Sequence, residues 1–157
     1  MSKDEDFVEH LFIANTHNYM LFFTDQGKCY WLKVYDIPQG GRATRGRAIV
    51  NLIGCASGEK VEAFVSVKEF DDNHYIAMAT RNGIVKKTVL SAYGKPRKGG
   101  IYAIEIRDGD KLIEARITNG EHDILLGTYE GKSIRFSEGN IRASGRKTMG
   151  VKGITLS

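Results

Sequence analysis

Long apolar runs are missing from this chain of 157 residues. A helix that crosses a bilayer needs about 20 consecutive apolar residues, and no stretch here approaches that length. The first residues, MSKDEDFVEH, are acidic, whereas a secretion signal begins with basic residues followed by apolar ones. The sequence therefore predicts a soluble, cytoplasmic protein with no membrane partner.

Cysteine and proline are also scarce, with two of each. Cys29 and Cys55 stand apart and form no CxxC pair, which indicates two reduced thiols and no disulfide framework. Glycine, by contrast, occurs 18 times, so glycine is expected to make many of the sharp turns. The apolar content of 41% is sufficient for the core of one domain.

Catalytic and metal-binding patterns are likewise absent. The stretch from Gly127 to Ser133 resembles a Walker A loop, but it has three residues between its glycines where the motif needs four. The Asp108-Gly109-Asp110 turn lacks the other ligand positions of a calcium loop. The histidines are scattered and have no partners at ligand spacing. We expect no enzyme activity, no catalytic residues, no metal and no cofactor.

Short apolar segments with an alternating pattern, such as YMLFFTD, YIAMAT and DILLGT, run through the whole chain. Asn-Gly, Asp-Gly and similar pairs separate them, and these pairs supply the positive φ that tight hairpin turns need. No segment of ten residues shows a helical period. The pattern predicts an all-β fold.

One β-unit recurs three times in this pattern. Each copy has an apolar strand, a turn ending in Gly27, Gly83 or Gly131, a second strand with Lys or Arg, and a glycine-containing loop. The turn glycines recur at intervals of about 50 residues, the length of a four-stranded blade. We predict a propeller-like array of about three four-stranded blades over residues 7–157, after a flexible segment at 1–6. The approximate repeats are 7–57, 58–107 and 108–157.

The loop that ends each copy is basic and contains no acid. Its candidate contact residues are Arg42, Arg45, Arg47, Lys95, Arg97, Lys98, Arg142, Arg146, Lys147 and Lys152. The second strands and their turns add Lys28, Lys33, Lys86, Lys87, Lys132 and Arg135 as a second tier. Because the acids gather elsewhere in each copy, the pattern predicts a positive stripe along one edge of the array.

Such a stripe suits duplex DNA, whose phosphate charges recur at regular intervals along the axis. No recognition helix, zinc-finger spacing or RNA-binding aromatic motif is present, so binding is expected to follow the backbone with little regard to sequence. Three alternatives stay open at this point. The cations could simply solvate loops and strand edges, the array could bind acidic proteins, and Tyr30, Trp31 or Tyr35 could stack on bases or pack in the core.

The ordered stretches LFIANTHNYMLFFTDQGKCYWLKVYDIP, RGRAIVNLI, IAMATRNGIVKKTVL and GVKGITL resemble the C-terminal DNA-wrapping domain of bacterial DNA gyrase A. The related domain of topoisomerase IV is similar, and KVYDIP followed by RGRAIVNLI favours gyrase. The resemblance implies a β-pinwheel, a disc whose blades exchange strands and whose basic rim wraps duplex DNA. It also implies partnership with the rest of gyrase A and with gyrase B in ATP-dependent negative supercoiling by a type II topoisomerase.

The sequence departs from the complete family domain in two ways. It contains no gyrase A box of the QRRGGKG type, and GKPRKGG is only distantly similar to that box. It also has three repeats where the family usually has about six blades. We therefore expect an open arc of the disc, with no active-site tyrosine and with exposed strand edges that allow self-association.

Overall fold

The computed structural model describes residues 8–46 and 48–156. Its strands are β1 (Tyr19–Thr24), β2 (Lys28–Lys33), β3 (Val61–Val67), β4 (Tyr75–Thr80), β5 (Ile84–Val89), β6 (Ile101–Tyr102), β7 (Leu112–Thr118), β8 (Asp123–Gly127), β9 (Ser133–Ser137) and β10 (Val151–Lys152). One short α-helix, α1 (Ile49–Ile53), and three 3-10 turns, η1 (Val34–Asp36), η2 (Leu90–Tyr93) and η3 (Glu138–Asn140), join them. The predicted all-β class is confirmed. Within the described ranges, no helix is long and apolar enough to cross a membrane.

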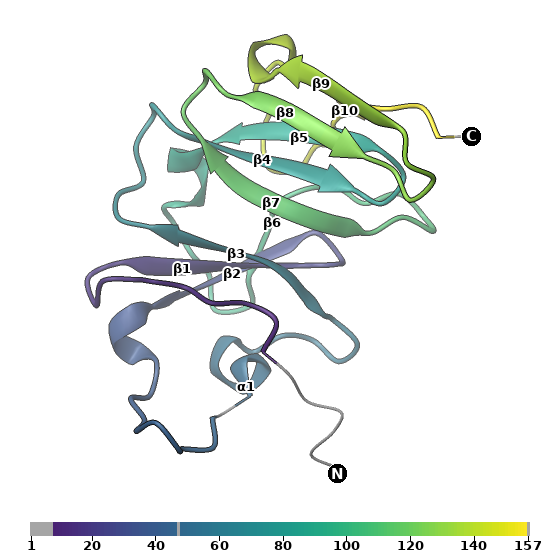
Figure 1. Cartoon of the computed structure of the whole chain (residues 1–157). Helices are drawn as coiled ribbons and strands as arrows, with labels where there is room; N and C mark the ends of the chain where they lie inside the picture. The colour runs from purple at the N-terminus through teal and green to yellow at the C-terminus, as the bar shows by residue number, and fades with distance from the viewer. Residues whose placement is uncertain (1–7, 47, 157) are drawn as a thin grey trace.

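The strands form three antiparallel sheets that lie one above another in Figure 1. The first sheet has the order β3-β1-β2-β6, the second β10-β5-β4-β7, and the third contains β8 and β9. Two of the three predicted blades therefore have four strands, whereas the third has two strands among the described residues. Sheet membership also crosses the predicted repeat ranges, because β3 lies in the range 58–107 and pairs with β1.

Each four-stranded sheet is completed by a strand from the following repeat. The two-residue strand β6 comes after the second hairpin but pairs with β2 of the first sheet, joining Cys29 to Ile101 and Lys28 to Tyr102. In the same way, β10 comes after the third hairpin and pairs with β5 of the second sheet. The strand exchange implied by the resemblance is therefore present in this fold.

The segment that corresponds to β6 and β10 in the first repeat is α1. It follows the first basic loop as β6 and β10 follow the second and third. Ile53 of α1 is buried with Met20, Phe22 and Tyr30 against the face of the first sheet that points away from the second sheet. The helix thus covers apolar side chains on the outer face of the first sheet.

The main core lies between the first and second sheets, where β3 and β7 also run beside each other (Figure 1). Leu21 and Phe23 of β1 are fully buried there against Ile76 and Met78 of β4. Burying a large apolar side chain contributes about 1.5–3 kcal/mol, so this cluster fixes the two sheets together. Trp31 packs against the same core.

The neighbouring Tyr30 points to the opposite face, because successive side chains of a strand alternate. Its ring is buried and its hydroxyl donates a hydrogen bond to Glu59 Oε1 at 2.9 Å. Tyr30 and Trp31 are therefore packed in the fold as core residues, whereas Tyr35 is 76% exposed.

The hairpin-turn glycines give a direct test of strand exchange. Gly27 and Gly131 occupy the same turn position in two repeats, with φ of 83° and 86°. A Cβ at Gly27 would lie 2.5 Å from the carbonyl oxygen of Ile104, just beyond β6, whereas a Cβ at Gly131 would meet nothing within 4 Å. Gly131→Ala is expected to lower the free energy of unfolding by about 1–2 kcal/mol, the cost of a left-handed alanine.

Gly27→Ala is expected to cost about 1–3 kcal/mol more than Gly131→Ala, because the backbone of the exchanged segment must also move. Urea unfolding of the two variants measures the difference. Equal losses would contradict the close packing of the exchanged segment on the first hairpin.

Candidate nucleic-acid interface

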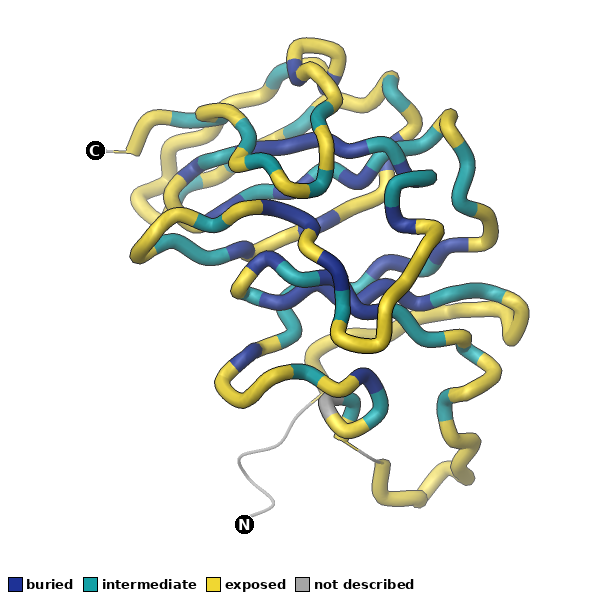
Figure 2. The backbone as a smooth tube through the Cα atoms, turned by 180° about the vertical axis from the view of Figure 1, so that it is seen from behind, coloured by how far each residue is buried: buried dark blue, intermediate teal, exposed yellow. Residues whose placement is uncertain are grey.

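The three basic loops lie on one side of the molecule. We name residues 37–48 the first basic loop, 94–100 the second and 141–150 the third. Seen from behind, the second and third loops cross the molecule one above the other, and the first lies below them (Figure 2). The described residues of the first loop and those of the second are largely exposed, whereas the third alternates between exposed and half-buried residues.

The first basic loop presents Arg42 and Arg45, both of which are exposed. A tight turn holds it, in which Thr44 Oγ1 accepts from the N–H of Gly41 at 2.8 Å and the N–H of Thr44 donates to the carbonyl of Gly41. The third predicted arginine of this loop, Arg47, lies outside the described residues.

The second basic loop presents Lys95, Arg97 and Lys98, and all three are exposed. Gly100 closes the loop with a φ of 77°, and a Cβ at this position would lie 2.7 Å from Cε1 of the Tyr30 ring. A shallow hollow runs between this loop and α1, with Arg97 and Lys98 on one wall and residues 51–54 on the other. The second loop and α1, which directly follows the first basic loop, are therefore neighbours in space.

The third basic loop is hydrogen-bonded to β6, the strand that follows the second basic loop. Nη1 of Arg146 donates to the carbonyl oxygen of Tyr102 in β6 at 3.0 Å. Lys28 Nζ of β2 lies 5.7 Å from the centroid of the Tyr102 ring, within the range of a cation–π contact. Lys147 lines a hollow that Tyr102 also borders. Three cations from two separate segments, β2 and the third basic loop, thus lie around the half-exposed Tyr102.

Tyr102 is a candidate contact residue that sequence reasoning missed. It is 52% exposed, whereas the preceding Ile101 is buried. The alternation within IYAIEI carries this signal, because it puts Tyr102 on the face opposite the buried isoleucine. What the pattern alone did not reveal is that the exposed face lies between two basic loops.

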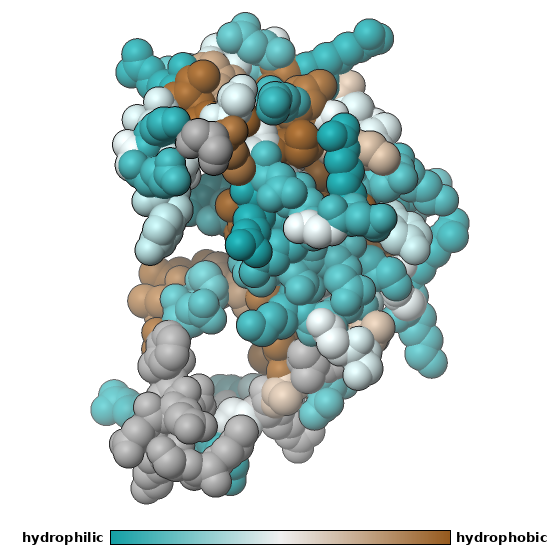
Figure 3. Space-filling view, turned by 90° about the vertical axis from the view of Figure 1, so that its right-hand side faces the viewer, coloured by the Kyte–Doolittle hydropathy of each residue, from teal (hydrophilic) through white to brown (hydrophobic). Residues whose placement is uncertain are grey.

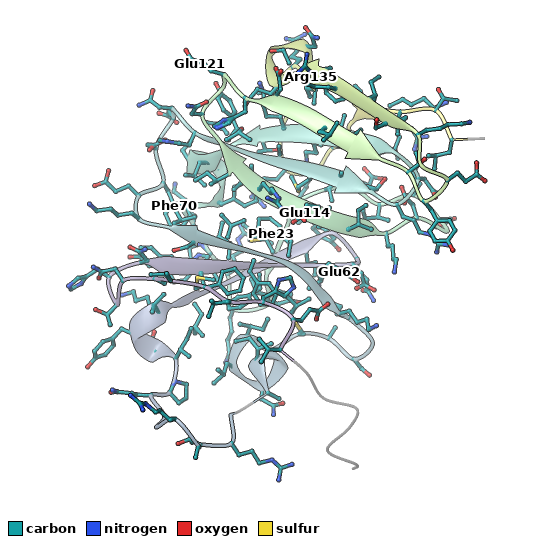
Figure 4. All side chains as sticks on the ribbon, in the orientation of Figure 1. Phe23, Glu62, Phe70, Glu114, Glu121 and Arg135 are labelled. Atoms are coloured by element: carbon teal, nitrogen blue, oxygen red, sulfur yellow. The ribbon has the colours of Figure 1, made fainter. Side chains whose placement is uncertain are left out.

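Arg142, Lys147 and Lys152 are exposed, and Arg146 is half-buried by its contact with β6. In the second tier, Lys28 is half-buried while Lys33 and Lys132 are exposed. Arg135, on β9 of the third sheet (Figure 4), lies 3.7 Å from Asp123 in an exposed ion pair. These positions are compatible with contact to a large polyanion.

Lys86 and Lys87 are exceptions, and the prediction that they reach an external partner is wrong. Lys86 is 1% exposed and donates to the carbonyl oxygens of Ala103 and Arg146. Lys87 is 6% exposed and donates to the carbonyl oxygen of Glu138, with its ammonium 3.7 Å from the Glu138 carboxylate. Both ammonium groups find their partners inside the protein, because the second sheet, to which β5 belongs, lies between the first and third sheets.

Acidic residues mark the opposite edge of the sheets. Glu62 on β3 and Glu114 on β7 (Figure 4) lie on the edge strands farthest from β6 and β10. The second and third basic loops lead into β6 and β10, at the edges opposite Glu62 and Glu114. The edge of β3 and β7 is mixed in charge, because it also carries the exposed Lys60, Lys68 and Arg116, whereas the basic loops contain no acid.

Comparison with known proteins agrees with this architecture. The family model described as DNA gyrase C-terminal domain, beta-propeller, matches residues 18–67, 74–119 and 122–157. Among the solved structures, the C-terminal domain of DNA topoisomerase IV superposes with a TM-score of 0.83 at 29% identity, covering 90% of this chain and 44% of that one. The DNA gyrase A C-terminal domain gives 0.76 at 24% identity, covering 92% and 45%.

Among curated proteins, DNA gyrase A of Clostridium acetobutylicum is 48% identical over 152 residues, which is 97% of this chain and 18% of that protein. DNA gyrase A of Haemophilus influenzae is 44% identical over 155 residues, covering 99% and 18%. The chain thus spans less than a fifth of the length of these relatives. With three successive segments matched and with blades that exchange strands, this chain belongs to the DNA gyrase C-terminal domain family.

Proposed function

We propose that this chain is a non-catalytic module that binds and wraps duplex DNA along its three basic loops, with little regard to sequence. The observation that carries the proposal is the gathering of Lys28, Arg146 and the second basic loop around Tyr102, on the edge opposite Glu62 and Glu114. Cations at successive steps along an edge match the regular phosphate charges of a duplex.

Contact with the phosphates is expected to combine charge with backbone donors. Arginine forms forked hydrogen bonds to phosphate and lysine acts as a point charge. The glycines beside these residues let the main chain approach closely. Each phosphate neutralised releases counterions, which makes the binding free energy depend on salt.

In the whole protein, we propose that the module acts with the rest of gyrase A and with gyrase B in ATP-dependent negative supercoiling in the bacterial cytoplasm. The similarity to gyrase A over 97% of the chain supports this role. We also propose residues 7–157 as one domain of three repeats, supported by the three segments that the family model matches.

Self-association through the third sheet is a further part of the proposal. Among the described residues β9 pairs only with β8, and Leu125 on β8 is 71% exposed. Apolar side chains gather at this level of the molecule (top of Figure 3). An open strand edge beside exposed apolar surface favours pairing between chains, which light scattering over a dilution series would detect as a falling mean mass.

The proposed DNA binding is tested by fluorescence anisotropy with a random-sequence duplex at increasing salt. Binding is expected at about 50 mM salt, and log Kobs should fall against log salt with a slope of about −0.9 per phosphate neutralised. A duplex of different sequence should give the same slope. Polyglutamate of matched charge serves as the acidic-protein comparison. No binding at low salt, or equal affinity for polyglutamate, would contradict the proposal.

A further inference from the structure

Two adjacent lysines of β5 point to opposite sides of the second sheet. Lys87 faces η3, beyond β9 of the third sheet, where it contacts Glu138. Lys86 faces the first sheet, where it meets the segment that follows β6. The two other repeats have Tyr30 and Ile134 at the position of Lys86, three residues after their turn glycines. A buried cation here is therefore special to the middle repeat.

The ammonium of Lys86 joins two segments that are far apart in sequence. It donates to the carbonyl oxygen of Ala103, directly after β6, and to that of Arg146 in the third basic loop at 2.6 Å. In the part of the chain that the structure describes, no carboxylate lies within ion-pair distance of it. Because an unneutralised buried charge is costly, the two carbonyls are its main compensation.

The same loop is held at three other points. The N–H of Ser144 donates to the carbonyl of Lys87 at 2.8 Å, and the N–H of Glu105 donates to that of Thr148 at 3.0 Å. The side chain of Arg146 reaches Tyr102 in β6. Of these contacts with the Ser144–Thr148 stretch, the bond from Lys86 is the one that fixes the main chain of Arg146, directly before the exposed Lys147.

We propose that Lys86 is a positioning residue of the DNA interface. Its buried ammonium holds the main chain of the third basic loop against the exchanged strand, and thereby sets where Arg146 and Lys147 present their charges. This inference rests on the proposed function, since it assigns a residue to the same interface. Lys86 itself does not touch DNA.

A pH dependence follows from the surroundings of Lys86. Burial, and to a smaller extent the charge of Arg146, lower its pKa to about 8. Cys29 of β2 and Tyr93 of η2 belong to the core on this side, and burial raises the pKa of both, so they are neutral at this pH. The segment that follows β6 also carries Glu105, which is exposed. Glu138 and Lys87 interact on the opposite side of β5.

Bound phosphates would favour the charged form of Lys86, so DNA binding takes up a proton near pH 8. Affinity should then decline as the pH rises above 8. The free energy of unfolding of the protein without DNA changes with pH in the opposite direction. Between pH 8 and the ordinary lysine pKa, the unfolded chain keeps the Lys86 proton that the folded chain has lost, so the contribution of this group to stability rises with pH.

The test compares Lys86→Met with Lys95→Met, which removes an exposed lysine from the second basic loop. Duplex affinity is measured for each variant alone and combined with Arg146→Ala. In the parent chain and in Lys95→Met, Arg146→Ala is expected to weaken binding about tenfold; in Lys86→Met its effect should shrink to about threefold or less. The decline in affinity above pH 8 should vanish in Lys86→Met alone. Additive losses, or an unchanged pH profile, would overturn the proposal.

Hydrogen exchange without DNA separates this inference from the proposed function. The amides of Ser144 and Glu105 should exchange at least about tenfold faster in Lys86→Met and at the parent rate in Lys95→Met. Failure of the parent chain to bind DNA overturns the proposed function, whereas unchanged exchange in Lys86→Met overturns the anchoring role of Lys86. Lys86→Gln, which can still donate to one carbonyl, replaces the methionine variant if that variant does not fold.

Discussion

Glu138→Gln is expected to lower the free energy of unfolding by about 3–5 kcal/mol. Glu138 is fully buried, and its two carboxylate oxygens accept from the hydroxyl of Thr118 and the N–H of His122, both at 2.9 Å. The ammonium of Lys87 lies 3.7 Å from the same carboxylate. Glutamine keeps the shape but leaves the buried ammonium without a counter-charge, and its NH₂ group cannot accept a hydrogen bond.

The loss should be large because this cluster links η3, which follows the third sheet, to both β5 and β7 of the second sheet. The ammonium of Lys87 also lies 4.7 Å from the centroid of the Tyr75 ring, which offers partial compensation but no negative charge. Against a typical total stability of about 5–15 kcal/mol, the substitution leaves a marginal fold. The β8–β9 hairpin is expected to detach first.

Urea unfolding followed by circular dichroism measures the effect, and the exposed pair of Glu114 and Arg116 supplies a matched control. Their side chains are 48% and 78% exposed and lie 3.5 Å apart. Glu114→Gln should therefore cost less than about 1 kcal/mol. The double variant Lys87→Met/Glu138→Gln should cost less than the sum of its single changes. Equal effects of Glu138→Gln and Glu114→Gln would contradict a structural role for the buried pair.

Reversing four cations of the second and third basic loops is expected to abolish measurable duplex binding. The variant changes Arg97, Lys98, Arg146 and Lys147 to glutamate. Each change removes one attraction to phosphate and adds one repulsion, so affinity should fall by at least about a thousandfold at low salt. Any residual binding should show a salt slope smaller by about 0.9 for each lost contact. Anisotropy with the same random duplex measures both quantities.

The control makes the same change in net charge elsewhere on the surface. Lys60, Lys68, Arg81 and Arg116 are all exposed, and three of them lie on or beside β3 and β7. Reversing these four should weaken binding by less than about tenfold, through long-range repulsion that salt screens. Comparable losses in the two variants would mean that net charge, and not the basic loops, determines binding.

Local patterns were sufficient to predict much of this fold. Alternating apolar residues and turn glycines depend on contacts a few residues apart, which is why the hairpins at Gly27, Gly83 and Gly131 are all where they were expected. The second and third basic loops also take up corresponding places, because each leads into a strand that is exchanged with the preceding sheet. The basic loops of the second and third repeats therefore lie together in space.

The sequence could not distinguish lysines that look alike. Lys86, Lys87 and Lys95 are all lysines in or near a basic loop of the sequence. In the structure, Lys86 and Lys87 are buried and Lys95 is exposed. Burial depends on whether a neighbouring sheet covers that face of the strand, and the covering residues, such as Ala103 and Glu138, come from other repeats. Those contacts exist only after the sheets have stacked.

By itself, the sequence determined the all-β class, the threefold unit and the basic loops, since each follows from residues close along the chain. The tertiary structure decided the rest: which cations stay at the surface, that Tyr102 lies among them, and that residues 49–53 form α1 while the equivalent segments form β6 and β10. A two-residue strand gains its hydrogen bonds only from a partner strand. Where β2 and β5 offer that partner, the segment is extended. Residues 49–53 instead pair their backbone groups within α1, which packs on the outer face of the first sheet.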